Sequence, residues 1–586
     1  MMQLSLLGAV PTWVSNWLTP LWLLGLGTLI GLAVLLLLWA VALLLSRIPA
    51  IGSLAEDPKR RNTITPILSV ASFFGLLAIV LPQLANPDGT YDSDTLVVAS
   101  LVMIPFAILI GVGLVWLTSK RTVTEVPQAV REGALWPLFL IAVGFATFSF
   151  VGGAIATNPE EILRSVARVP FAGTTVVTPS IPGTPLEVLD DEGRDPPQTP
   201  VEVNIRSDEL AALTIESSQK VSVDNEPSDQ IDLNPFTELA EGDDYIWLRR
   251  ADGGALFEEE TVPTFYVRNY GQENAELKIT LTNRPLHPQA ASVWVTAFAV
   301  VATFLLYLVQ RAALPKMSAI ALATVKSELA QPLFLIITLL GLFAILIFNF
   351  IPYNTFGEDI KVLKDSGMVL IKVLCVILAV WAASNSIADE IEGKTALTVL
   401  SKPLRRRSFI LGKYLGIFWT ILIVFVILGG FLLLIVAYKP IYDAKESSAE
   451  SPVWQLCHFE MIGVVPGLVL AFMETCILAA ISVAISTRLP MLANFIISFS
   501  VYVVGHLTPL LVQSSVEGKA FEAVVFVAQL LSTVFPVLDH FSIEAAVAAG
   551  APVPHAYLGW ALLYTLVYGM IALLLALVLF EDRDLA

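Results

Sequence analysis

Eleven separate stretches of this chain are long and apolar enough to cross a lipid bilayer, and this pattern excludes a soluble globular fold. A membrane-spanning helix needs roughly 20 mostly apolar residues. The candidates are residues 17–46, 65–84, 95–118, 135–156, 290–311, 331–352, 366–388, 412–438, 461–486, 492–513 and 557–580. Of the 586 residues, 56% are hydrophobic and 15% are charged, against about 25% charged in average soluble domains. The sequence therefore predicts an α-helical polytopic membrane protein with about 11 transmembrane helices.

A twelfth apolar stretch, residues 521–537, is shorter and contains Pro536 near its end. We expect it to re-enter the membrane from the outer side and not to cross. The first span is too long for the apolar region of a signal peptide, and no basic residue precedes it. It is therefore expected to be retained.

The loop from Ser386 to Gly416 sets the predicted orientation. Its basic residues are Lys394, Lys402, Arg405, Arg406, Arg407 and Lys413. Short loops rich in Lys and Arg stay in the cytoplasm, so eleven spans place the N-terminus outside and the C-terminus in the cytoplasm. The first predicted outer loop, residues 85–94, agrees because it has three aspartates and no Lys or Arg.

Residues 158–289 differ in composition from the rest of the chain. They hold 25 acidic residues against 10 Lys or Arg, which accounts for nearly all of the net charge of −17. Four parts favour β-strands and are bounded by turn residues, namely 201–205, 245–248, 264–267 and 276–282. We expect an inserted extracytoplasmic β-rich domain that resembles a sandwich, with a proline-rich loop at 178–200.

Two roles remain open for this domain. It could capture an extracytoplasmic ligand or protein partner, or it could be a spacer whose acidic side chains are simply solvated. Its negative charge argues against nucleic acid as a ligand.

The three cysteines form neither a disulfide framework nor a metal motif. Cys375 and Cys476 lie within predicted spans, and only Cys457 is expected to face outward. Cys457 and its neighbour His458 fall short of the three or four ligands that a metal site needs. We expect no metal site.

The basic loop also has the features of a docking surface. Pro403 removes a backbone donor and disfavours helix at Lys402, so the helix that leaves the membrane must break. The residues expected to meet a partner are Asp389, Glu390, Glu392, Gly393, Lys394, Thr395, Leu397 and Leu400. Arg405, Arg406 and Arg407 are expected at anionic lipid headgroups. A simpler interpretation is that all these charges only anchor the topology.

The order of motifs in this loop resembles the loop between the second and third helices of ABC-2 type permeases. The matching elements are the acidic helix end at Asp389, Gly393-Lys-Thr395, Ser401-Lys-Pro403 and Phe409-Ile-Leu-Gly-Lys413. Weaker matches lie at residues 356–360 and 535–542. The pattern is most similar to the subgroup of permeases linked to nitrous-oxide-reductase maturation and to gliding motility.

The resemblance implies a permease module at residues 316–586 with six transmembrane helices. An amphipathic elbow helix at 315–331 would open it, with Ala321 and Val325 on its apolar face and Thr324 and Glu328 on its polar face. A second permease copy or homologue and a separate ABC-type ATPase, docked at 389–411, would complete the transporter. The rest of the chain divides into a four-helix region (1–157), the β-rich domain (158–289) and a fifth helix with its linker (290–315).

The tripeptide Gly393-Lys394-Thr395 also ends the phosphate-binding P-loop, but its context is wrong. The P-loop needs a glycine five residues before Gly393, where Ala388 stands, and the neighbouring acids would repel phosphate. The chain also lacks the sequence motifs of common hydrolases. We therefore predict a chain that is no enzyme and binds no cofactor, with ATP hydrolysed by a partner subunit.

Ionisable residues within membrane spans are costly and commonly functional, and three of those in the predicted spans stand out. Glu474 and Lys372 are candidates for a translocation path or a helix seam. A pair between them would lower both desolvation costs, but the depth of Lys372, about 9 Å below the outer end of its helix, favours a side chain that reaches outward. His506 is expected to be a simply packed or interfacial residue.

The leading hypothesis is the permease subunit of an ATP-driven exporter in a bacterial inner membrane. A non-transporting anchor that presents the acidic domain to an envelope assembly is the first alternative. A secondary transporter driven by protons through Glu474 is the second.

Overall fold

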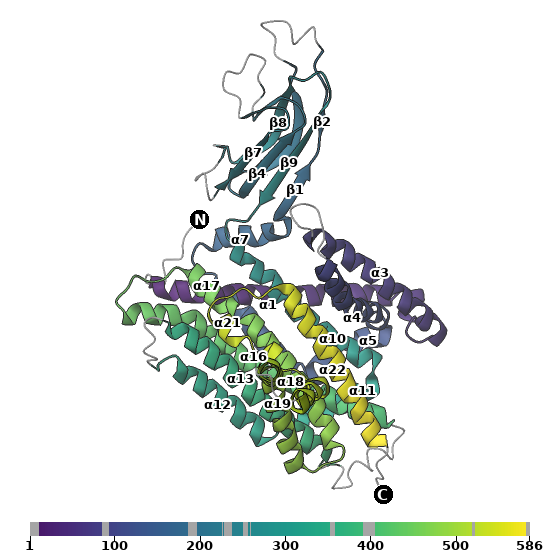
Figure 1. The fold of residues 1–586 in the computed structure, drawn as a ribbon. Helices are drawn as coiled ribbons and strands as arrows, with labels where there is room; N and C mark the ends of the chain where they lie inside the picture. The colour runs from purple at the N-terminus through teal and green to yellow at the C-terminus, as the bar shows by residue number, and fades with distance from the viewer. Residues whose placement is uncertain are drawn as a thin grey trace. The chain divides into compact units, whose positions relative to one another are not determined.

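The computed structural model describes residues 11–84, 93–185, 196–225, 227, 237–249, 256–257, 259–351, 358–388, 390, 405–517 and 522–581. The chain forms two compact units (Figure 1). A helical unit combines Met1–Thr157 with Val295–Ala586, and a second unit spans Asn158–Trp294.

The first part of the helical unit precedes the second unit in the chain. It consists of α1 (Thr12–Ser46), α2 (Pro49–Gly52), α3 (Pro58–Leu84), α4 (Ser93–Leu117), α5 (Lys120–Glu132) and α6 (Trp136–Gly152). The second part consists of α10 (Ala291–Ala313), α11 (Pro315–Leu329), α12 (Pro332–Phe348), α13 (Asp359–Ala383), the π-helical turn η3 (Ser384–Ala388), α16 (Arg406–Glu446), α17 (Trp454–Gly463), α18 (Val465–Ser486), α19 (Met491–Glu517), α20 (Glu522–Val534), the short η4 (Asp539–Phe541), α21 (Glu544–Ala548) and α22 (His555–Glu581). Proline opens α11 and α12, where its missing N–H costs nothing because no helical partner exists for it.

Within the described residues, eight helices are long and apolar enough to cross a membrane, or up to eleven if each of three bent helix pairs is one span. The bent pairs are α5 with α6 (85°), α11 with α12 (64°) and α20 with the segment 539–548 (58°). All eleven predicted stretches fall on helices, which confirms a multi-pass membrane protein. The stretch at 65–84 lies on α3, which does not meet this length and hydropathy criterion.

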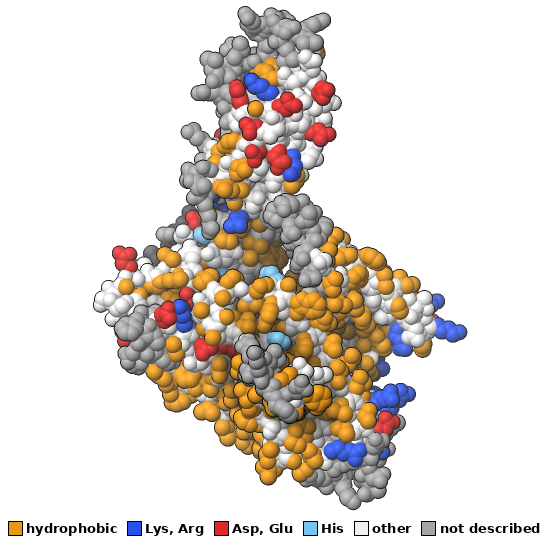
Figure 2. Space-filling model, viewed as in Figure 1, with side chains coloured by type: hydrophobic (Ala, Val, Ile, Leu, Met, Phe, Trp, Pro, Cys, Tyr) orange, Lys and Arg blue, Asp and Glu red, His pale blue; other side chains and the backbone are white. Residues whose placement is uncertain are grey.

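The 41-residue helix α16 lies at the centre of the helical unit. Its buried side chains share a core with α12, α13, α18 and α22. The N-terminal helix α1 packs on the same helix, because Trp17 Nε1 donates a hydrogen bond of 3.2 Å to the backbone oxygen of Leu434. The N-terminal helices and the permease-like helices therefore form one body. Hydrophobic side chains cover most of its visible face, as expected for contact with lipid (Figure 2).

The second unit is a sandwich of two antiparallel sheets. The first has the strand order β1 (Gly173–Val177), β9 (Ala275–Asn283), β4 (Leu210–Ser217), β7 (Asp244–Leu248), with β2 (Ser180–Ile181) also paired to β9. The second has the order β3 (Thr199–Arg206), β8 (Thr261–Asn269), β5 (Val221–Asp224), β6 (Thr237–Leu239). Alternating residues of both sheets are buried in one shared core, including Val201, Leu213, Phe265 and Ile279.

The four predicted strands correspond to β3, β7, β8 and β9, which confirms the sandwich pattern. The strands β1, β4, β5 and β6 were not predicted. The sequence of β5, Val-Ser-Val-Asp, alternates apolar and polar residues, but all four residues are buried. The proline-rich segment is also less irregular than expected, because β2 forms inside it. Acidic side chains are prominent on the visible face of the sandwich (Figure 2).

All three cysteines are free and buried. Cys457 lies on α17 and is fully enclosed, and the expectation that it faces the outer side of the membrane stays a prediction.

Candidate functional site

A cluster of charged side chains is buried among the helices of the helical unit. Lys372 on α13 lies between Glu474 of α18 and Glu544 of α21, with Nζ–carboxylate distances of 3.4 Å and 2.6 Å. The side chain of Lys372 is 4% exposed, that of Glu474 is 0% exposed and that of Glu544 is 7% exposed. One lysine is thus enclosed with two carboxylates that come from different helices.

Two more polar groups complete this cluster. His506 on α19 places Nε2 3.3 Å from Glu474 Oε1 and 3.0 Å from the hydroxyl of Ser542, while its Nδ1 lies 2.9 Å from the backbone oxygen of Tyr502. The Ser542 hydroxyl also accepts a hydrogen bond of 3.2 Å from Lys372 Nζ. We call Lys372, Glu474, His506, Ser542 and Glu544 the charge cluster.

The charge cluster joins elements that are far apart in the sequence. Burying an ion costs several kcal/mol unless a partner of opposite charge compensates it, so Lys372 holds α18 and α21 against α13. The expectation that Lys372 reaches outward is wrong, since its side chain points to Glu474 and Glu544 instead. His506, expected to be only packed or interfacial, contacts the same carboxylate.

A second buried polar network lies near the end of α13. The side-chain amide nitrogen of Asn494 on α19 lies 2.7–2.8 Å from the hydroxyls of Ser384, Ser482 and Ser486. Ser384 begins the π-helical turn η3, and the other two serines are on α18. Hydrogen bonds of this kind join helices inside membranes, so Asn494 connects α13, α18 and α19.

Most of the predicted docking residues lie outside the described residues, namely Asp389, Glu392, Gly393, Lys394, Thr395, Leu397 and Leu400. Glu390 is described, and its carboxylate lies 2.5 Å from Nζ of Lys413 on α16. This ion pair joins the two ends of the loop. Lys413 is 8% exposed in the pair and Glu390 is 33% exposed, so the lysine is shielded from solvent more than the carboxylate.

The three arginines of the loop are exposed at the start of α16. Arg406 donates hydrogen bonds of 2.6 Å and 3.3 Å to the backbone oxygens of Glu581 and Phe580. These carbonyls are at the C-terminus of α22, where a cation is favoured by the helix dipole. Arg406 therefore connects α16 to α22 in addition to any role at the membrane surface.

The elbow helix α11 packs closely on the start of α16. An added Cβ at Gly416 would lie 2.5 Å from Cβ of Thr324, and one at Gly412 would lie 2.8 Å from Cβ of Ile320. The spacing of these two glycines allows two helix backbones to approach. The loop restart is therefore fixed against α11.

Two residues of the predicted polar face of α11 are buried. Thr324 and Glu328 are each 1% exposed. Glu328 Oε1 accepts hydrogen bonds of 3.3 Å from Asn385, in the turn η3 that follows α13, and 3.4 Å from Gln331. The elbow helix thus contacts both helices that flank the loop.

Comparison with known proteins identifies the family of this chain. A family model described as an ABC-2 family transporter protein matches residues 210–585, which is more than half of the chain. The chain belongs to the ABC-2 transporter family. It is thus a transmembrane component of a transporter. No curated protein matches it.

The ABC-2 match begins at Leu210, the first residue of β4, and not at the predicted residue 316. It therefore includes most of the sandwich as well as the six predicted C-terminal spans. Permeases of the ABC-2 family typically work with an ATPase partner, and the subgroup suggested by the sequence motifs stays a prediction.

The ABC-2 match covers every residue of the charge cluster. The sequence analysis selected Lys372, Glu474 and His506 but missed Ser542 and Glu544. The signal for Glu544 was a single acid that precedes the apolar run Ala545–Ala549. Asn494 was also missed, because one amide inside an apolar span does not reveal its partners.

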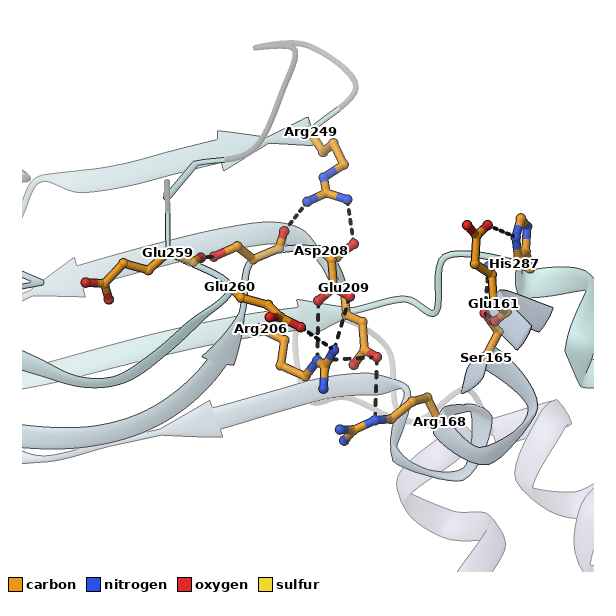
Figure 3. A network of polar contacts seen from close by, with 11 residues as sticks. Glu161, Ser165, Arg168, Arg206, Asp208, Glu209, Arg249, Glu259, Glu260 and His287 are labelled. Atoms are coloured by element: carbon orange, nitrogen blue, oxygen red, sulfur yellow. Dashed lines mark hydrogen bonds and ion pairs between the residues drawn. The ribbon is translucent and has the colours of Figure 1, made fainter. Parts of the chain in front are cut away.

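The sandwich of this ABC-2 protein carries its own polar network (Figure 3). Arg206 at the end of β3 contacts Asp208, Glu209 and Glu260 at 3.2–3.7 Å, and Arg168 of α7 (Pro159–Arg168) reaches the same Glu209 at 3.6 Å. The hydrogen bond to Asp208 raises the pKa of the Arg206 guanidinium, although desolvation opposes it. The network fastens α7 to the sandwich within this unit.

Proposed function

We propose that this chain is the permease subunit of an ATP-driven exporter, energised by a separate ABC-type ATPase that docks at residues 389–411. A second permease copy or homologue completes the channel, and ATP is bound and hydrolysed by the partner. The transporter sits in a bacterial inner membrane with the docking loop, and the C-terminus, in the cytoplasm. The sandwich is then extracytoplasmic.

The observation that most directly supports this proposal is that both ends of the loop are held in place by contacts with the helical unit. The ion pair between Glu390 and Lys413 joins the loop ends, and the Gly412–Gly416 contact fixes the restart on α11. A force applied by a partner at the loop would therefore move α11, α13 and α16 together.

The charge cluster supplies a place for that force to act. Lys372 and the loop are on the same element, because α13 runs from Asp359 to Ala383 and continues into η3. Twelve residues separate Lys372 from Ser384, or about 18 Å along the helix axis. A shift of α13 would pull Lys372 away from Glu474 and Glu544 and would loosen α21.

The test is co-purification of an ABC-type ATPase with this chain from its native membrane, with ATP hydrolysis as a second readout. Lys394→Glu combined with Glu390→Lys should abolish co-purification while the permease remains monodisperse. A charge exchange, Glu390→Lys with Lys413→Glu, restores the ion pair and separates its loss from the loss of docking. If the Lys394→Glu and Glu390→Lys variant retains full binding and ATPase activity, the docking proposal is wrong.

The charge cluster favours one other function, transport driven by protons through Glu474. Carboxylates and a histidine enclosed together are typical of proton pathways in membranes. In that case Glu474→Gln abolishes transport, and depletion of ATP at a constant proton gradient does not. The ATP-driven exporter predicts that ATP depletion stops transport.

The third candidate function is a non-transporting anchor, which only the acidic surface of the sandwich supports. It predicts that the chain recruits an envelope partner through residues 158–289 and that no ATPase co-purifies.

A further inference from the structure

The helical unit contains an apolar crevice away from the charge cluster and the docking loop. It has a volume of about 530 Å³ and lies between α1, α4, α5, α6 and α10. Its walls include Leu35 and Trp39 of α1, Val130 of α5, Phe139 of α6 and Phe304 of α10. Among the described residues that line it, Arg131 is the one charged side chain.

The elements around this crevice place it at the level of a membrane surface. The helix α5 carries apolar Val123, Val126 and Val130 on one face and charged or amide side chains on the other, as interfacial helices do. It meets the apolar α6 at an angle of 85°. If α6 spans the membrane, α5 therefore lies parallel to the membrane surface. Trp39 and Trp136 also line the crevice, and tryptophan is enriched at membrane interfaces.

The charges of α5 point to an anionic ligand. Arg121 pairs with Glu125 at 3.1 Å, and Glu132 accepts a hydrogen bond of 3.0 Å from Gln128. Arg131 makes no ion pair within the described part of the chain, and it is exposed at the edge of the crevice. An uncompensated guanidinium at the mouth of an apolar cavity suits a phosphate group.

We propose that this crevice is a binding site for an anionic phospholipid, with one acyl chain in the crevice and the headgroup phosphate at Arg131. Its volume lies within the range of about 300–1,000 Å³ for ligand sites and its walls offer apolar contact. Basic pockets between transmembrane helices on the cytoplasmic side bind anionic headgroups, and the predicted orientation places α5 on that side. The inference does not depend on the proposed ATPase partner.

The experiment compares lipid binding to the full-length protein and to three variants by native mass spectrometry and by thermal unfolding in detergent. The probes are phosphatidylglycerol and phosphatidylcholine with identical acyl chains. Arg131→Gln should weaken phosphatidylglycerol binding about fivefold, the value of one basic residue near a membrane surface. It should weaken phosphatidylcholine binding less, because the choline cation offsets the charge of the phosphate. Ala42→Trp should fill the crevice and prevent the binding of both lipids at this site.

Arg121→Gln is the matched control, because Arg121 is exposed on the same helix but does not line the crevice. It should bind both lipids like the unmodified protein. Inorganic phosphate at millimolar concentration should not compete, which distinguishes a lipid site from a free-phosphate site. Equal losses for Arg121→Gln and Arg131→Gln, unchanged phosphatidylglycerol binding in Arg131→Gln, or competition by phosphate would each overturn the proposal. If Ala42→Trp does not fold, the comparison of the two arginine variants still decides the outcome.

Discussion

The charge cluster of the helical unit and the Arg206 network of the sandwich use the same kinds of side chain in opposite surroundings. Lys372 and its two carboxylates are at most 7% exposed in their pairs. In the sandwich the side chain of Arg206 is 29% exposed, and its partners Asp208 and Glu260 are 45% and 81% exposed. Both sets have similar distances between opposite charges.

The difference in burial decides what each network does. Exposed ion pairs contribute roughly 0–1 kcal/mol, because water and salt already stabilise each charge. Removing one partner of a buried pair is far more costly, since neither water nor an opposite charge then stabilises the remaining charge. The charge cluster therefore contributes strongly to holding its helices together, whereas the Arg206 network contributes little to holding α7 on the sandwich.

The largest expected effect follows from Lys372→Met, which would leave Glu474 and Glu544 enclosed without a cation. The free energy of unfolding should fall by about 3–5 kcal/mol, measured by denaturant titration in detergent. Adding Glu474→Gln and Glu544→Gln to the same chain should recover most of the loss. If Lys372→Met alone is as stable as the unmodified protein, the cluster is hydrated and does not hold the helices together.

Gly416→Ala should have the next largest effect, because its new Cβ would meet Thr324 and the backbone oxygen of Ala321. Overpacking of this kind costs about 1–3 kcal/mol, and α11 should separate from α16. Gly430→Ala is the matched control on the same helix, since its added Cβ would have nothing within 4 Å. Cysteine cross-linking between α11 and α16 in both variants measures the separation, and equal yields would contradict the close contact.

Asn494→Leu should lower stability by about 1 kcal/mol, which is typical for hydrogen bonds between membrane helices. The loss arises because three serine hydroxyls from η3 and α18 lose a shared partner. Ser500→Ala on the same helix is the control, because the Ser500 hydroxyl is exposed and bonds only to the preceding turn. Thermal unfolding of both variants compares them, and a larger shift for Ser500→Ala would refute this assignment.

Arg206→Gln should have the smallest effect, below about 1 kcal/mol and weaker still at high salt. Circular dichroism of the β-sheet signal during heating of the full chain measures it at low and high ionic strength. A loss as large as that of Lys372→Met would remove the distinction between the two networks.

The sequence predicts well what depends on local pattern. Long apolar runs predicted the helices, and period-two alternation predicted β3 and β9, whose buried residues alternate. The strand β5 also alternates apolar and polar residues, but it is only four residues long, so its pattern was not recognised. Local pattern was also misleading for α11, because Glu328 looks like a solvent-facing residue until Asn385 and Gln331 are brought to it by tertiary packing.

The site was only partly predictable for the same reason. The cost of ions in membranes selects Lys372 and Glu474 from the sequence. Depth along a helix suggested that they do not meet, yet the structure brings them to 3.4 Å. The third partner, Glu544, is 70 residues after Glu474, and only the fold of α20 to α21 places it there. Arg131 likewise has no motif, and its role depends on a crevice formed by five helices.

The burial of all three native cysteines has a practical consequence for watching this protein move. Thiol reagents react with accessible thiolates, so Cys375, Cys457 and Cys476 should remain unlabelled in the folded protein. A cysteine introduced at an exposed position such as Arg405 would then carry a spin label or fluorophore alone. The signal of such a label would report motion at the start of α16, without first removing any natural cysteine.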